Sequence, residues 1–207
     1  MVESGAIFPD AGFVLGATAP QLKPMSFGGL GTVRMTDTQQ EIQIRGAVLD
    51  DAEALVSVLN PIIEAGTTAL DTMLTVADER DYIASLPERA IFLVAARALD
   101  GTLVGCQSVE PFTTGGTHAF DHVGVMGTYV AVGHQRRGIG RRLFEAMFEQ
   151  ARRKGYEKIF TYVRADNTAG MAAYLGQGFR VIGTAERHAK IDGQYIDEVL
   201  IERFLPD

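Results

Sequence analysis

An apolar, β-branched stretch at residues 123–132 leads through a glycine-containing turn into an amphipathic stretch at residues 138–154. Apolar residues of the second stretch recur every four positions, as on one face of a helix: Ile139, Leu143, Met147 and Ala151. Gly155 follows, and glycine is favoured at the left-handed position that ends helices. A buried strand joined to a helix in this way favours a sheet with helices packed against it.

From residue 41 onward, strand and helix patterns alternate. Asp100-Gly101 provides a hairpin turn, and Asp50 or Asp51 can cap the first helix. The expected strands are residues 41–45, 90–95, 102–109, 123–132, 159–163, 179–183 and 195–204. The expected helices are a segment from about 51 through 59, then 78–86, 138–154 and 168–175. This order predicts an α+β fold, a central mixed sheet flanked by helices.

The first 40 residues differ from the rest of the chain. They hold three prolines and a glycine cluster at residues 28–31, and they show no sustained period of 2 or 3.6. We therefore expect a flexible N-terminal extension at residues 1–40 and one folded domain at residues 41–207. Met25 or Met35 as the true start of the protein is a related hypothesis.

Composition narrows the functional classes. A net charge of −7 argues against a nucleic-acid-binding protein that relies on a broad basic surface. No apolar stretch approaches the roughly 18 residues that a membrane-spanning helix needs. The single cysteine, Cys106, lies in an apolar run and is expected to be a buried small residue. One cysteine forms no intramolecular disulfide, which favours a cytoplasmic protein.

The turn before the long helix has the composition of an anion site. Its amides at a helix start carry partial positive charge, and Gly138 and Gly140 let phosphate oxygens approach closely. Four arginines stand at the same end, where acidic residues are usual: Arg136, Arg137, Arg141 and Arg142. A dinucleotide-binding fingerprint needs a third glycine where this chain has Leu143. The turn therefore predicts a diphosphate site of another kind.

These residues resemble the GNAT superfamily of N-acetyltransferases. The cofactor motif of that family, Gln or Arg, two residues, Gly, one residue, Gly or Ala, matches Gln135, Gly138 and Gly140. A second signature follows downstream: Asn167, Tyr174 and Gly178-Phe179, with Gly170 where the family usually has alanine. The resemblance covers about residues 41–205 and is strongest over 128–184. It implies a GNAT-like acyl-CoA N-acyltransferase fold and acetyl-CoA as cosubstrate.

The resemblance also implies roles for single residues. The backbone of Val130 and Val132 would pair with the pantetheine arm, and the Val130 amide would polarise the thioester carbonyl. Amides at residues 136–142 would hold the pyrophosphate, and Asn167 would contact the cofactor arm. Tyr174 would protonate the leaving thiolate.

The attacking amine must be neutral, so direct transfer also needs a base. Some family members place a glutamate on the strand before the cofactor turn, and residues 121–128 contain none. His122 is the first candidate, followed by Asp121 and Glu110; a solvated loop-end histidine is the alternative. His118 and His122 stand four residues apart, but they flank a loop and no metal site is expected.

The resemblance implies transfer of an acetyl group from acetyl-CoA to a primary amine in a ternary complex. Residues 62–68 resemble amino-acid and herbicide acetyltransferases, so we expect a small-molecule acceptor such as an amino acid or analogue. Segments 60–75, 111–121 and 184–197 are expected to line its pocket. A catalytically silent CoA-binding module, a transferase for longer acyl groups, and one acting on a protein N-terminus remain alternatives. A homodimer through the C-terminal strands is a further hypothesis.

Overall fold

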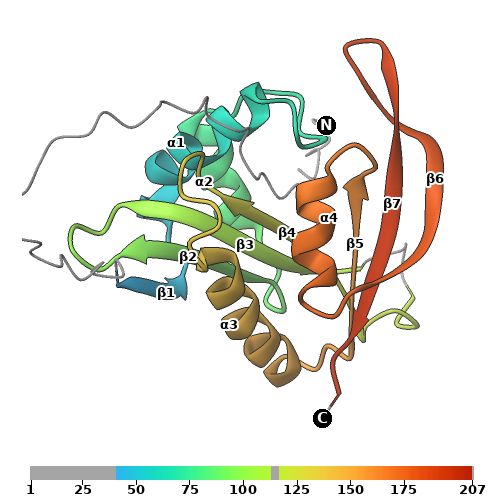
Figure 1. Ribbon diagram of the computed structural model, residues 1–207. Coiled ribbons are helices and arrows are strands. Elements are labelled where there is room, and N and C mark those ends of the chain that lie inside the picture. Colours follow the sequence, from blue (N-terminus) through green and yellow to red (C-terminus); the bar gives the residue numbers. More distant parts are fainter. Residues whose placement is uncertain (1–40, 113–116, 207) are drawn as a thin grey trace, which may run out of the picture.

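The computed structural model describes residues 41–112 and 117–206, so the prediction for residues 1–40 lies outside the described residues. Within those ranges, seven strands form one mixed sheet in the order β1-β2-β3-β4-β5-β7-β6 (Figure 1). The strands are β1 (Ile42–Gly46), β2 (Ile91–Arg97), β3 (Leu103–Pro111), β4 (Val123–Val130), β5 (Lys158–Arg164), β6 (Arg180–Ile191) and β7 (Gln194–Phe204). Neighbouring strands run antiparallel except β4 and β5, which run parallel.

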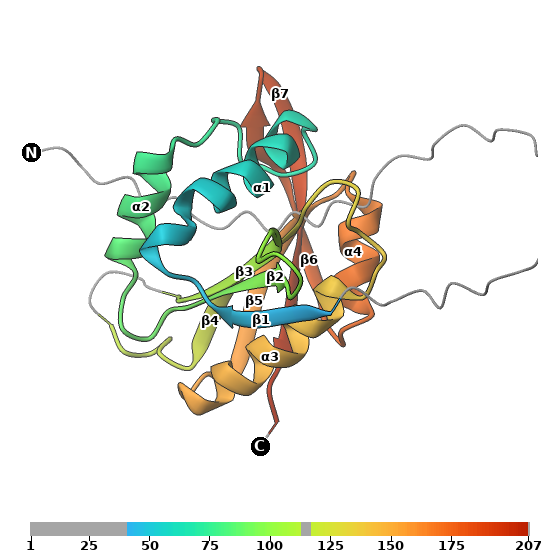
Figure 2. The same cartoon turned by 90° about the vertical axis from the view of Figure 1, so that its left-hand side faces the viewer.

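Helices cover both faces of this sheet. They are α1 (Ala52–Glu64), preceded by the 3-10 turn η1 (Leu49–Asp51), then α2 (Val76–Ser85), α3 (Ile139–Arg153) and α4 (Thr168–Leu175). Figure 2 shows α1 and α2 on one face and α3 on the other. The α+β prediction with a flanked mixed sheet is confirmed. None of the described helices combines the length and the apolar character that crossing a bilayer requires.

Apolar side chains pack on each face of the sheet. The α3 residues Leu143 and Met147 are buried with α4 in one cluster, and the α1 residues Leu55 and Ile62 are buried in the other. Cys106 belongs to the α1 cluster and is 1% exposed, which confirms that it is a buried small residue.

Several elements extend beyond their predicted bounds, and helix α2 and strand β6 show two different reasons. Helix α2 begins earlier than expected because Thr75 caps it: its hydroxyl accepts from the Asp78 amide at 3.1 Å, and its own amide donates to the Asp78 carboxylate. Strand β6 continues to Ile191 although residues 184–190 are mostly polar and exposed. Strand β6 lies at the edge of the sheet, where backbone pairing with one neighbour holds it. Its sequence therefore shows no alternation of apolar and polar residues from which the strand could be predicted.

Candidate functional site: a gap between two parallel strands

Strands β4 and β5 separate soon after they meet. Three backbone pairs join them, from Val123 to Val125 on β4. Beyond Val125 the described residues form no further pair between these strands, although β4 continues to Val130. The Thr161 hydroxyl crosses the start of the gap and donates to the Met126 carbonyl at 2.7 Å. The edge of β4 that faces β5 is therefore open to an extended ligand that can pair with a strand.

A tight turn connects the open end of β4 to α3. Gly133, Arg136 and Gly138 have positive φ values of 81°, 60° and 80°, which bend the chain back sharply. Gln135 holds this turn together: its side-chain oxygen accepts from the Gly133 amide at 2.9 Å, and its side-chain nitrogen donates to the Val130 carbonyl at 3.3 Å. The glutamine of the motif thus ties the turn to the end of β4.

The start of α3 is left open for an anion. Its N-cap, Gly138, makes no side-chain hydrogen bond, and its first turn carries no acidic residue. The first backbone bond runs from the Arg142 amide to the Gly138 carbonyl at 3.1 Å, so the amides of residues 139–141 point toward the helix end. Four arginines surround the turn and are exposed: Arg136, Arg137, Arg141 and Arg142. Gly140 is buried beside them. This arrangement fits a diphosphate.

Asn167 caps α4 and connects it to the loop between α1 and α2. Its side-chain oxygen accepts from the Gly170 amide at 2.8 Å, and its nitrogen donates to the Thr67 carbonyl at 3.2 Å. A Cβ atom on Gly170 would lie 2.7 Å from that nitrogen, so glycine suits this position. Arg164 makes a parallel connection by donating to the Thr68 carbonyl at 3.2 Å.

Tyr174 lies beneath the gap on the α3 side of the sheet. Its side chain is fully buried, and its hydroxyl donates to Thr128 on β4 at 3.1 Å. The Gln107 side-chain nitrogen donates to the same Thr128 oxygen at 2.8 Å. The rings of Phe144 and Phe179 hold the phenol edge-on, with centroids 5.3 and 5.0 Å away. A phenol held in this way can supply a proton to a group in the gap.

His122 is not brought together with these residues. It precedes the first residue of β4 and is exposed, whereas the turn into α3 follows Val130 at the other end. Eight extended residues span roughly 26 Å at about 3.3 Å each. Asp121 lies at the same far end, and its carboxylate oxygen Oδ2 accepts a hydrogen bond from His118 Nδ1 at 3.0 Å. No group of three or more His, Cys, Asp or Glu residues suited to a metal occurs among the described residues.

A sequence profile of the Acetyltransferase (GNAT) family matches residues 61–179, more than half of the chain. The chain belongs to this family. It is an N-acetyltransferase, with acetyl-CoA as the donor that the family uses.

Relatives of the acetyltransferase act on different acceptors. Phosphinothricin N-acetyltransferase of Streptomyces coelicolor is 25% identical over 166 residues, which cover 79% of this chain and 96% of that protein. N-alpha-acetyltransferase RimI of Mycobacterium tuberculosis is 36% identical over 101 residues, 48% of this chain and 59% of that protein. The crystal structure of ribosomal-protein-alanine N-acetyltransferase from Brucella melitensis matches with TM-score 0.70 and 28% identity, over 79% of this chain and 99% of that one.

Sequence reasoning named Glu110 of the acetyltransferase among the candidate bases but missed its neighbours Tyr82 and Glu79 on the α2 side of the sheet. The Tyr82 hydroxyl donates to Glu110 Oε1 at 2.7 Å. Burial raises the pKa of the Glu110 carboxyl, and the hydrogen bond from Tyr82 partly opposes that effect. Glu79 is 2% exposed, its Oε1 has no hydrogen-bond partner, and burial raises its pKa to about 7. The three-residue spacing of Glu79 and Tyr82 was visible in the sequence; their proximity to β3 was not.

Proposed function

We propose that this acetyltransferase moves an acetyl group from acetyl-CoA to the primary amine of a small molecule, such as an amino acid or an analogue, by direct attack in a ternary complex. One observation carries the proposal: the gap after Val125 lies between an uncapped helix start and the buried hydroxyl of Tyr174. A donor with an extended arm and a diphosphate needs both features along one line.

Individual residues receive roles in this proposal. The backbone of Val130 and Val132 pairs with the donor arm, and the amides from Arg136 to Arg142 hold the pyrophosphate. Asn167 shapes the end of the arm site through its cap on α4. We also propose that residues 41–207 form the catalytic domain in the cytoplasm, with residues 1–40 outside it.

Acetyl-CoA supplies an acyl carbon activated by a thioester. The Val130 amide stabilises negative charge that develops on the carbonyl oxygen, as an oxyanion donor does. Tyr174 gives its phenolic proton to the leaving thiolate. His122 lies too far along β4 from Tyr174 to act on the same amine, so it is not part of the proposal.

A second candidate acceptor is the α-amine of a protein or peptide. The similarity to RimI and to the ribosomal-protein-alanine enzyme favours it. A single kinetic experiment separates the candidates: free-thiol release from acetyl-CoA by the full chain, with amino acids, phosphinothricin-type analogues, simple amines and alanine-terminated peptides as acceptors. We expect release with at least one small amine.

Two other results have definite meanings. Calorimetric binding of CoA without thiol release from any acceptor identifies a silent CoA-binding module. The absence of both binding and turnover, with acetyl-CoA and with longer acyl-CoAs, removes the basis of the proposal.

A further inference from the structure

Strand β4 offers no carboxylate to remove a proton from the acceptor. Between Val123 and Val130 its only ionisable side chain is Tyr129. Gly124 leaves no room for one, because a Cβ atom there would lie 2.6 Å from a methyl carbon of Val109. An alkyl ammonium has a pKa near 10 and needs a base before it can attack a carbonyl. The base has to come from a neighbouring element.

Glu110 on β3 stands beside the point where the gap begins. It pairs with Val125, the last β4 residue that pairs with β5, where Phe160 is the partner. Residues paired across neighbouring strands project to the same face of a sheet. That face carries α2, since Tyr82 reaches Glu110 from there. Tyr174 reaches β4 from the opposite side, where it packs with α3.

Glu79 adds a second carboxyl to this side. It is buried and precedes Tyr82 by three residues on α2, so the two side chains share one face of that helix. Its charge contributes to raising the pKa values of Tyr82 and of Cys106. Cys106 pairs with Tyr129 on β4 and precedes Glu110 by four positions on β3, so both project to the same face of the sheet. A buried carboxylate oxygen without a donor is rare in native proteins, and an N–H donor of a ligand would satisfy it.

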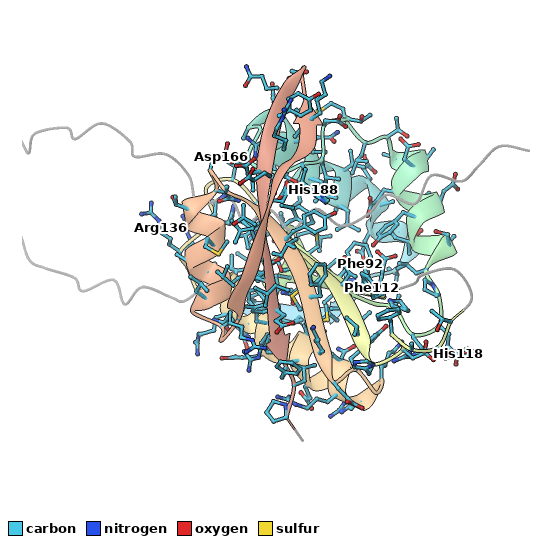
Figure 3. The ribbon with its side chains drawn as sticks, turned by 90° about the vertical axis from the view of Figure 1, so that its right-hand side faces the viewer. Phe92, Phe112, His118, Arg136, Asp166 and His188 are labelled. Atoms are coloured by element: carbon cyan, nitrogen blue, oxygen red, sulfur yellow. The ribbon has the colours of Figure 1, made fainter. Side chains whose placement is uncertain are left out.

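Aromatic rings lie next to the two carboxyls. Phe92 meets the Tyr82 ring edge-on at 5.6 Å, and Phe112 meets Phe160 at 6.0 Å. All four rings are half-buried. Figure 3 shows Phe92 and Phe112 between the strands and α2. Such rings hold apolar groups and attract an ammonium over their faces.

Three of the described cations near this side are held in ion pairs. Arg164 makes an ion pair with Asp166, and both Lys158 and Arg180 pair with Glu202. Two carboxyls and an aromatic wall favour a positive charge and disfavour a carboxylate carried next to it.

We propose that Glu110, held by Tyr82 and with Glu79 on the same face of α2 as Tyr82, binds the ammonium of the acceptor and accepts its proton, and that the acceptor is an arylalkyl or similarly apolar primary amine with no carboxylate beside the nitrogen. This inference rests on the proposed transfer to a small primary amine, and it narrows that class to amines without an α-carboxylate in place of unmodified amino acids. Tyr82 acts as a positioning residue through its hydrogen bond to Glu110.

The proton balance is complete within these groups. One proton of the ammonium passes to a Glu110 oxygen, and the freed nitrogen lone pair forms the N–C bond as the C–S bond breaks. Tyr174 protonates the sulfur. A second nitrogen proton leaves as the amide forms and restores the phenol of Tyr174. Glu110 then releases its proton to water.

Phenethylamine and phenylalanine form a matched test, because they differ by one carboxylate. We expect kcat/KM for phenethylamine to exceed that for phenylalanine by about tenfold or more. Glu110→Gln keeps the shape of the side chain and should lower kcat/KM for phenethylamine about a hundredfold, with the KM for acetyl-CoA unchanged. Glu53→Gln, an exposed carboxyl on α1, is the control and should leave both values unchanged.

Two further variants protect the test against a folding defect. Glu110→Asp keeps the charge and should restore part of the activity that Glu110→Gln loses. Tyr82→Phe should displace the pH profile of kcat/KM while thermal unfolding stays cooperative. Tyr82 on α2 and Tyr156 before β5 are the titratable groups whose charges couple to Glu110.

Calorimetric titration with phenethylamine separates this inference from the proposed function. Binding to the wild type and loss of binding in Glu110→Gln, without thiol release, supports the ammonium site and rejects the transferase proposal. A second outcome overturns the inference and leaves the transferase proposal intact. In that outcome, Glu110→Gln releases thiol as fast as the wild type, and phenylalanine is used as well as phenethylamine. Neither binding nor release overturns both.

Discussion

The two sides of the β4–β5 gap are built in different ways. The α3 side comes from one continuous part of the chain, residues 123–179, and it presents mainly backbone amides of a strand edge and a helix start. The α2 side is assembled from α2, β3 and β5, and it presents side chains. Backbone groups recognise what all donors share, whereas side chains can distinguish one acceptor from another. We infer that changes of side chains on the α2 side can change the acceptor, whereas the backbone of the α3 side continues to bind the same donor.

The largest expected effect is on the α3 side. Tyr174→Phe removes a proton donor and its bond to Thr128, and we expect kcat to fall about a thousandfold. Tyr156→Phe is the control, since it removes a comparable bond to the Arg89 carbonyl at 3.0 Å. Steady-state kinetics and thermal unfolding of both variants check this. Equal kcat values for the two variants would assign Tyr174 to packing alone.

The α2 side should show its character in the pH dependence of stability. In the folded protein the pKa of Glu79 is about 7, above the 4.5 expected in an unfolded chain. The contribution of the protonated Glu79 to the free energy of unfolding is therefore fully present below about pH 4.5 and is lost as pH rises through 7. We expect the free energy of unfolding of the wild type to fall by about 3 kcal/mol relative to Glu79→Gln between about pH 4 and pH 8. Denaturant titrations at several pH values measure this difference, and parallel curves would contradict it.

A matched pair of glycines tests whether backbone geometry carries donor binding. Gly138 and Gly155 have φ values of 80° and 79°, and added Cβ atoms would meet nothing within 4 Å at either site. Alanine at each should destabilise the fold similarly, by about 1 kcal/mol. Only Gly138→Ala should also raise the KM for acetyl-CoA, about tenfold, which corresponds to one weakened charge-assisted hydrogen bond. An equal KM in the two variants would move the anion site away from the turn.

The smallest effect should come from charges at the rim of the turn. Arg137→Ala should raise the KM for acetyl-CoA about threefold at low salt and less at high salt, because exposed charges are screened. Arg153→Ala, at the other end of α3, should have no such effect. A salt-independent change would indicate a direct, buried contact instead.

The difference between the two sides also explains what the sequence could predict. Three features could be predicted because each depends on residues close together in the chain: the turn before α3, the helix α4, and the spacing from Asn167 to Tyr174. Glu110 was one candidate among several, since its place beside Val125 depends on a strand pairing across 15 positions that no local pattern announces. Strand β6 was predicted too short because an edge strand needs no apolar alternation. His122 followed from residue type, and the strand direction places it at the far end of β4.

The incomplete ladder between β4 and β5 has a thermodynamic consequence. A ligand that pairs with the open edge of β4 binds only the folded chain, since that edge does not exist in the unfolded one. Such a ligand stabilises the fold by about 2.7 kcal/mol when its free concentration is a hundred times its Kd. If the donor pairs with this edge as proposed, we expect the melting temperature of the protein to rise with the concentration of acetyl-CoA.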